Sequence, residues 1–236
     1  MSTTSLSPLP AAYRQTTEAL HRLAVYVIAP AQRLANGEIN LRATPGGFST
    51  FSYHGHVVGV DGDQLVVDGT RSPITTLNAA ATAVGITPDV AQQEQFDVPP
   101  HGDLDDQLAV DAESARALGD WYAFATEALD TLRAEANPGD DASIVRIWPE
   151  HFDAAIDMGD KSAQRRGTYG ASPGDNHHAE PYIYVSPWAG RIDDFFDDPT
   201  FKGASLLHSH LVSHADPMGT ALSFLRDARD RIQHHV

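Results

Sequence analysis

The spacing of apolar residues near the start of the chain predicts a helix with one buried face. Between residues 11 and 28, apolar side chains recur every three or four positions, which is the helical period: Leu20, Leu23, Ala24, Val27 and Ile28. We expect Pro30 to kink or end this helix, because proline has no N–H to donate and its ring clashes with the preceding turn. The Asn-Gly pair at 36–37 then predicts a turn.

Short strands are expected next. An alternating run at 39–43 and the segment at 48–53, which carries aromatic residues, predict the first two. The clearest hairpin is predicted where apolar runs at 57–60 and 65–67 flank Asp-Gly-Asp at 61–63, because Asp-Gly readily adopts the positive φ angles of a tight turn.

The middle of the chain predicts one short helix and one long connection. Thr75 or Thr76 can cap a helix that runs to Val84, and Gly85 can end it in a left-handed conformation. Residues 88–110 hold three prolines and six acidic residues without a sustained period. We therefore expect an exposed crossover there, and any boundary between two halves would lie in it.

The C-terminal half begins with the strongest helical pattern. Asp111 can cap a helix that runs to about Arg133, since its apolar residues repeat at three and four. Further strands are predicted at residues 143–147, 168–171, 182–186 and 206–212. Asp216 and Pro217 then open a final helix to Ile232, with Asp as its cap and Pro in its first turn.

These elements predict an α+β fold, with antiparallel sheets flanked by helices. We expect a disordered tail at 1–10 and a single compact domain at 11–236, with possible halves at 11–87 and 111–236. Both halves carry Glu-Ala-Leu on a helix and a later Pro-x-x-Phe. This shared order is compatible with two related helix-strand-hairpin-helix halves packed as one unit, but it does not by itself show a duplication.

Charge and composition exclude several classes of function. The chain has 236 residues, 42 % of them apolar, so it can bury a full core. Asp and Glu number 32 against 16 Lys and Arg, and a formal charge of −16 disfavours nucleic acids and anionic membranes as partners. The absence of cysteine removes disulfides and thiolate chemistry. The first residues lack the pattern of a signal peptide, so we expect a cytoplasmic protein.

Standard nucleotide and hydrolase motifs are missing from the sequence. There is no phosphate-binding Gly-Lys-Ser or Gly-Lys-Thr, no Gly-x-Gly-x-x-Gly and no Gly-x-Ser-x-Gly. Nucleotide hydrolysis, a Rossmann cofactor and the common serine-hydrolase arrangement therefore lose support.

Three short motifs carry a resemblance to a known family. Trp-Pro-Glu-His-Phe-Asp at 148–153, Ser-Pro-Gly-Asp at 172–175 and Glu-Pro-Tyr at 180–182 resemble the signature of a bacterial domain of unknown function. The order of elements agrees over most of the chain, although the first half is shorter and has 44–48 in place of an aromatic, histidine-bearing patch. The resemblance implies one integral unit with an antiparallel sheet, and it brings no catalytic residue, cofactor or substrate.

Histidine-rich segments suggest a divalent-metal site. Imidazole and carboxylate groups are common ligands of zinc and iron. The candidate ligands are His208, His210, His214, His151 and His178. If residues 206–212 form a strand, His208 and His210 point to the same face. The alternative is that these histidines face water, because no standard metal-binding spacing is present.

Three carboxylates are candidate catalytic groups. The turn at 172–175 could present Asp175 beside a cleft, and Glu180 could act as general acid or base in an apolar setting. Asp153 joins them as a candidate beside His151. The simpler alternatives are a plain hairpin turn at Asp175 and a solvent-exposed Glu180.

Two functions follow from these candidates. In the first, the chain is a small-molecule-binding protein or a metal-assisted enzyme with a pocket in its C-terminal half, where histidines bind the ion and Glu180 moves protons. In the second, it is a non-catalytic interaction or scaffold protein whose acidic surface meets a basic partner. Convergence of carboxylates and imidazoles in one concave site would favour the first. The sequence leaves the oligomeric state open.

Overall fold

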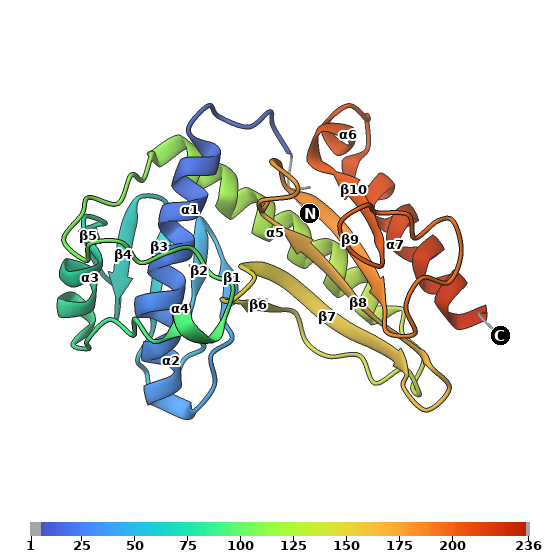
Figure 1. Ribbon diagram of the computed structural model, residues 1–236, viewed down its shortest axis with the longest axis horizontal. Coiled ribbons are helices and arrows are strands. Elements are labelled where there is room, and N and C mark those ends of the chain that lie inside the picture. The colour runs from blue at the N-terminus through green and yellow to red at the C-terminus, as the bar shows by residue number, and fades with distance from the viewer. Residues whose placement is uncertain (1–5, 235–236) are drawn as a thin grey trace. The chain divides into compact units, whose positions relative to one another are not determined.

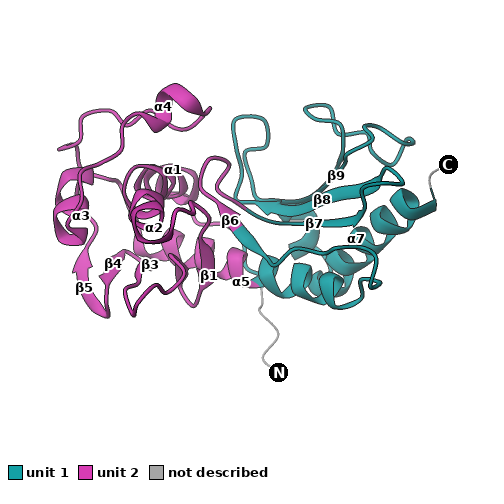
Figure 2. Cartoon of the chain, turned by 90° about the horizontal axis from the view of Figure 1, so that it is seen from below, with its two compact units in different colours: residues 1–8, 124–146, 154–236 teal, residues 9–123, 147–153 magenta. Residues whose placement is uncertain are grey.

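The computed structural model describes residues 6–234 and contains two antiparallel five-stranded sheets with several helices, which confirms the predicted α+β fold (Figure 1). The chain divides into two compact units (Figure 2): unit 1 is Met1–Pro8, Phe124–Arg146 and Ala154–Val236, and unit 2 is Leu9–Ala123 and Ile147–Asp153. Of the tail predicted at 1–10, residues 1–5 lie outside the described residues. Residues 6–10 belong to no helix or strand.

In unit 2, helices come before and after a small sheet along the chain. The first group is α1 (Tyr13–Leu23), the π-helix η1 (Ala24–Ile28) and α2 (Ala29–Asn36). The strands are β1 (Arg42–Thr44), β2 (Gly47–Ser49), β3 (Val58–Asp61), β4 (Gln64–Val67) and β5 (Thr70–Pro73), paired in this order. Helices α3 (Leu77–Val84) and α4 (Gln92–Gln95) follow. The crossover predicted at 88–110 lies wholly in this unit, so the division into units falls elsewhere.

The first helix is longer than the sequence predicts. Its apolar face continues through a wider turn at η1 and past Pro30, and the helix ends at Asn36, where Gly37 adopts φ 84°. Proline is compatible with this position because it stands in the first turn of α2, whose N–H groups need no partner within that helix. We expected Pro30 to kink or end the helix. Instead, the chain changes from the π-helix to the α-helix α2 just before Pro30 and stays helical to Asn36.

Two hairpins follow from their turn residues. The predicted turn joins β3 to β4, with Asp61 opposite Gln64 and Gly62 at φ 62°. A second turn, which was not predicted, joins β4 to β5 through Asp68 and Gly69 at φ 50° and 83°. Asp-Gly is the usual signature of such a turn, so the signal for β5 was present in the sequence.

Helix α5 (Ala112–Ala134) begins in unit 2 and ends in unit 1. Its predicted cap is confirmed, because the Asp111 carboxylate accepts the N–H of Ser114 at 2.9 Å. The second sheet is built from β6 (Arg146–Trp148), β7 (Asp153–Asp160), β8 (Arg165–Ser172), β9 (Tyr182–Pro187) and β10 (Ala204–Leu207), paired in sequential order. Strand β7 was not predicted. Each sheet is thus a sequential meander that follows a long helix.

The end of unit 1 corrects one prediction. Residues 206–212 are not one strand: β10 ends at Leu207, and α6 (His208–Val212) begins at the next residue. A five-residue alternation of polar and apolar residues fits a strand or a short helix, so the local pattern could not decide between them. Helix α7 (Pro217–His234) confirms the predicted final helix, and Asp216 accepts the N–H of Gly219 at 2.9 Å.

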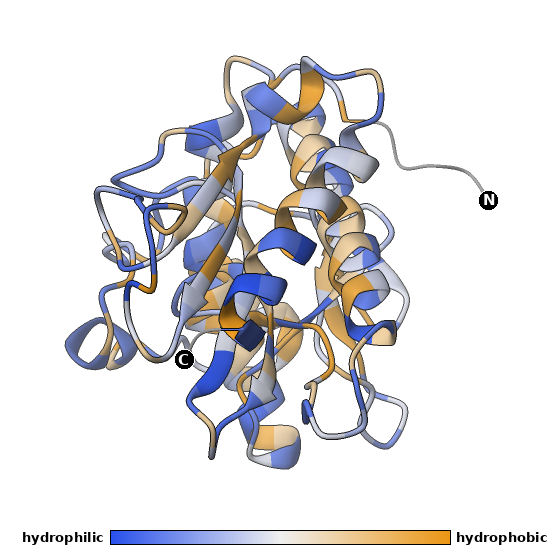
Figure 3. Ribbon diagram, turned by 90° about the vertical axis from the view of Figure 1, so that its right-hand side faces the viewer, coloured by the Kyte–Doolittle hydropathy of each residue, from blue (hydrophilic) through white to orange (hydrophobic). Residues whose placement is uncertain are grey.

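Each unit has its own apolar core. Helices and strands carry both apolar and polar residues (Figure 3), and the buried members include Tyr26, Phe48 and Tyr122 in unit 2 and Tyr169 and Leu225 in unit 1. Burying one large apolar side chain stabilises a fold by about 1.5–3 kcal/mol. Within residues 6–234, no helix combines the length and apolar character needed to cross a bilayer.

Candidate functional site

Asp175 is held in the turn between β8 and β9. Its Oδ1 accepts the backbone N–H groups of His177 and His178 at 2.6 and 2.7 Å, and its Oδ2 accepts the hydroxyl of Tyr182 at 2.7 Å. Burial raises the pKa of Asp175, but these hydrogen bonds outweigh that effect and leave its pKa below the ordinary value. The carboxylate stays ionised and fixes the turn.

His178 connects this turn to a second loop. Its Nε2 lies 3.0 Å from Oδ2 of Asp198, whose side chain is only 1 % exposed. An ionised carboxylate only accepts hydrogen bonds, so Nε2 carries the proton in this pair. Nδ1 of His178 is buried. It lies 3.8 Å from Oδ1 of Asp175, which is beyond hydrogen-bond distance. The structure thus brings together two predicted site residues, Asp175 and His178, and adds Asp198.

Asp198 is the anchor of that second loop. Ser205 Oγ donates to its Oδ2 at 2.5 Å, and Thr200 donates to its Oδ1 through both its backbone N–H and its hydroxyl, at 2.9 and 2.7 Å. Burial raises the pKa of Asp198, and the hydrogen bonds from Ser205 and Thr200 lower it by more. The Asp175–His178–Asp198 arrangement therefore connects two loops, and both oxygens of each carboxylate accept hydrogen bonds.

Glu180 binds the start of α6. Its Oε2 accepts the backbone N–H of Ser209 at 2.6 Å and its Oε1 accepts the hydroxyl of Ser209 at 2.9 Å. A carboxylate in this position satisfies N–H groups that a helix leaves unpaired in its first turn. This contact explains why residue 208 starts a helix, and it gives Glu180 a structural task. Its predicted role in proton transfer stays a prediction.

The three C-terminal histidines do not share a face. His208 is buried, and burial lowers its pKa against the opposing effect of Glu180. His210 and His214 are exposed, with ring centroids 4.4 Å apart. Residues two apart on a helix are separated by about 200° around its axis, so His208 and His210 point away from each other. The shared strand face expected for them is wrong because the segment is helical.

His151 and Asp153 belong to unit 2, whereas the other candidates belong to unit 1. His151 is exposed and Asp153 is buried at the start of β7. Among the described side chains, no group of three or more His, Asp or Glu residues is arranged to hold a metal ion. The predicted zinc or iron site therefore gains no support from the geometry.

A hollow in unit 2 offers a different candidate site. It is lined mainly by apolar side chains together with one amide and two charged groups: Val25, Ala29, Pro30, Arg33, Ile39, Gln92, Phe96, Val98, Pro149 and Glu150. About 270 Å³ of empty space lies in the hollow, open solvent at its mouth included, and the hollow has room for about one water-sized molecule. The hollow therefore suits a small ligand or one end of a longer one.

The π-helix η1 shapes one wall of this hollow. Its wider turn closes with the N–H of Ala29 donating to the carbonyl of Ala24, five residues earlier. Pro30 has no N–H for the carbonyl of Tyr26, and the N–H of Asp89 donates to that carbonyl at 2.9 Å. The carbonyl of Tyr26 therefore holds the loop that carries Gln92 against the helix. Single π-turns inside α-helices are frequent at functional sites.

One of the two charges in the lining is balanced by a neighbour. Arg33 forms an ion pair with Asp89, which also accepts a hydrogen bond from Gln92 Nε2 at 2.8 Å. Burial raises the pKa of Asp89, but the bonds from Gln92 and Arg33 leave it below the ordinary value. Glu150 has no such neighbour: its Oε2 is buried and makes no hydrogen bond within residues 6–234.

Glu150 stands on a tightly held turn. The carbonyl of the preceding residue, Pro149, accepts a hydrogen bond from Nε2 of His21 at 2.8 Å. The ring of His21 stacks on Phe152, with centroids 4.8 Å apart, and the carbonyl of Phe152 accepts the hydroxyl of Tyr122 at 2.7 Å. Phe152 adopts φ 55°, a conformation that costs about 1–3 kcal/mol for a residue other than glycine. The backbone around Glu150 is thus fixed on both sides.

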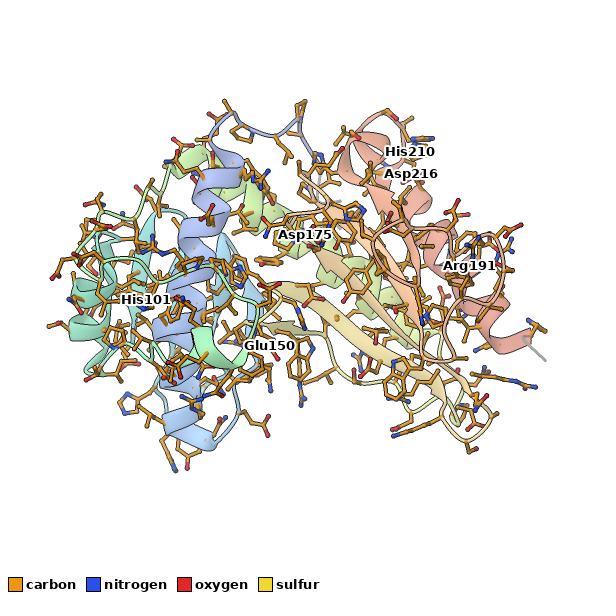
Figure 4. The ribbon with its side chains drawn as sticks, viewed as in Figure 1. His101, Glu150, Asp175, Arg191, His210 and Asp216 are labelled. Atoms are coloured by element: carbon orange, nitrogen blue, oxygen red, sulfur yellow. The ribbon has the colours of Figure 1, made fainter. Side chains whose placement is uncertain are left out.

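Two neighbours of Glu150 were predicted as site residues, and Glu150 itself was not. His151 was predicted as a metal ligand and Asp153 as a catalytic group, but His151 is exposed, and it is Glu150 that lines the hollow beside α4 (Figure 4). The available signal was a carboxylate directly after Trp-Pro and within three residues of Phe152. No family model matches the chain, and no curated protein or solved structure is significantly similar to it.

Proposed function

We propose that this chain is a small-molecule-binding protein whose ligand enters the hollow of unit 2. The observation that carries the proposal is the buried Oε2 of Glu150, which has no hydrogen-bond partner within residues 6–234, in a mainly apolar lining. Ligand sites are typically concave and apolar with a few fixed polar groups, and Glu150 is fixed by the turn described above. The pocket expected in the C-terminal half stays a prediction.

The loop that lines part of the hollow is held in place by two further hydrogen bonds. The hydroxyl of Tyr26 donates to the carbonyl of Pro99 at 2.6 Å, and Arg22 donates to the carbonyl of His101. These contacts hold the loop that contributes Phe96 and Val98 to the lining. A binding site whose walls are already ordered loses less conformational entropy when a ligand enters.

The test is a ligand titration followed by backbone amide NMR of the full chain. Small organic fragments should shift the amides of Ala29, Gln92 and Val98 in a saturable way. The variant Ile39→Phe enlarges a lining residue and should abolish the shifts, whereas Leu34→Phe makes a similar change at a side chain that is 75 % exposed and outside the lining. Shifts that survive Ile39→Phe, or no saturable shifts at all, would overturn the proposal.

A further inference from the structure

The charges around the hollow determine which ligand it prefers. Arg33 is paired with Asp89, and Glu150 is the remaining charged residue of the lining. Oε2 of Glu150 is buried without a hydrogen-bond partner within residues 6–234, and burying a charged oxygen in this way is costly, so a ligand that supplies a positive donor gains the most from entering. A neutral ligand leaves that cost in place, and an anionic ligand adds repulsion to it.

The shape of the carboxylate site agrees with a small cation. The last torsion of a glutamate side chain is soft, so Oε2 can turn toward a donor that reaches it. Hydrogen bonds between an ammonium and a carboxylate are short and about twice as strong as neutral ones. The hollow has room for about one water-sized molecule, and an ammonium head is of similar size.

The remaining wall is apolar and suits a short alkyl chain. Val25, Pro30 and Val98 contribute aliphatic surface to the lining, and Phe96 is 39 % exposed at the same hollow. The formal charge of −16 raises the local concentration of any small cation near the protein. Both features favour an apolar amine over a polar or anionic ligand.

We propose that the hollow binds a short-chain alkylammonium ion, with its nitrogen at the Glu150 carboxylate and its alkyl chain against Val25, Pro30 and Val98. This inference rests on the proposed binding function and names the class of ligand. Because so small a ligand makes few contacts, we expect a Kd of about 1 mM.

The experiment compares three probes of similar size on the full chain at pH 7: butylammonium, 1-butanol and butyrate. Butylammonium should bind at least about tenfold more tightly than 1-butanol, and butyrate should not bind. Glu150→Gln should remove that preference. Glu94→Gln removes the same charge from an exposed position on α4 outside the lining, and it should leave the butylammonium affinity within about twofold.

Each result separates the ligand class from the function. Equal binding of butylammonium and 1-butanol in the hollow would overturn the inference and leave the proposed function standing. Absence of hollow shifts with every probe and fragment would overturn both. If Glu150→Gln fails to fold, the relative affinities of the three probes for the parent chain still test whether the hollow prefers a cation.

Discussion

The backbone N–H of Asp89 donates to the carbonyl oxygen of Tyr26 at 2.9 Å, across 63 positions of sequence (89 − 26 = 63). Pro30 stands four residues after Tyr26 and has no N–H for that carbonyl. A residue usually read as a helix breaker therefore creates an acceptor for a distant loop. Because the N–H of Asp89 takes the place of the donor that Pro30 lacks, the loop is held where Gln92 lines the hollow.

Restoring the missing donor should loosen that loop. The variant Pro30→Ala gains an N–H that competes for the Tyr26 carbonyl and permits ordinary α-helical spacing through η1. We expect amide hydrogen exchange at Asp89 to become about fivefold faster, since one net hydrogen bond is worth about 1 kcal/mol. Pro88→Ala serves as the control, because it leaves the helix unchanged. An Asp89 amide with unaltered protection would contradict the role assigned to Pro30.

His21 should make stability fall at mildly acidic pH. Burial lowers the pKa of His21 to about 4, from about 6.5 in the unfolded chain, while the bond to Pro149 opposes the shift. The unfolded chain then binds the proton first, so His21 reduces stability progressively as pH falls from about 6.5 to about 4, by about 2–3 kcal/mol in total. Urea unfolding at several pH values measures the effect.

The variant His21→Gln provides the control for this pH effect. Its amide can still donate to the Pro149 carbonyl, but it does not titrate. We expect a flatter stability profile between pH 6.5 and 4, with a residual slope from His208, whose pKa burial also lowers. An unchanged profile in His21→Gln would show that His21 does not carry the effect.

Gly119 should resist a substitution that normally favours helices. It lies inside α5, where replacing Gly with Ala usually stabilises by about 1 kcal/mol. A Cβ at this position would lie 2.5 Å from the carbonyl carbon of Gly46, and that backbone cannot move aside cheaply. We therefore expect Gly119→Ala to destabilise unit 2 by about 1–3 kcal/mol.

Gly139→Ala is the matched control for this clash. A Cβ at Gly139 meets nothing within 4 Å. Its effect on the free energy of unfolding should stay within about 0.5 kcal/mol. If thermal unfolding shows the two variants to be equally stable, the close approach of α5 to the turn at Gly46 is wrong.

The parts of the fold that were predicted depend on residues close together in sequence. Thr76 caps α3 by accepting the N–H of Ala79, Gly85 ends that helix at φ 82°, and Asp111 caps α5. In each case the determining side chain lies within a few positions of the backbone group it affects. Such signals can be read without knowledge of the tertiary structure.

The missed features depend on contacts between distant segments. Helix α6 starts where Glu180 binds Ser209, 29 positions later, and a strand was predicted there instead. Glu150 lines a hollow together with Gln92 and Val98, which follow a loop held by the Tyr26 carbonyl. Local periodicity contains no information about these partners, so the sequence indicated the chemical groups but not which of them would meet.

Asp198 should be far more important for the stability of unit 1 than its neighbour Asp197. Its buried carboxylate accepts hydrogen bonds from Ser205, Thr200 and His178, and Asp198→Ala would leave these donors without their acceptor. We expect a loss of about 2–4 kcal/mol in urea unfolding at pH 7.

The same measurement on Asp197→Ala is the control for Asp198→Ala. Asp197 is exposed, so its removal should change the free energy of unfolding by less than about 0.5 kcal/mol. The pKa of Asp198 is lowered on folding, so its contribution is present at neutral pH and is lost as pH falls below the ordinary range of an aspartate. The difference between the two variants should therefore shrink in acid. A difference that is small at pH 7 would mean that the two loops do not depend on the Asp175–His178–Asp198 arrangement.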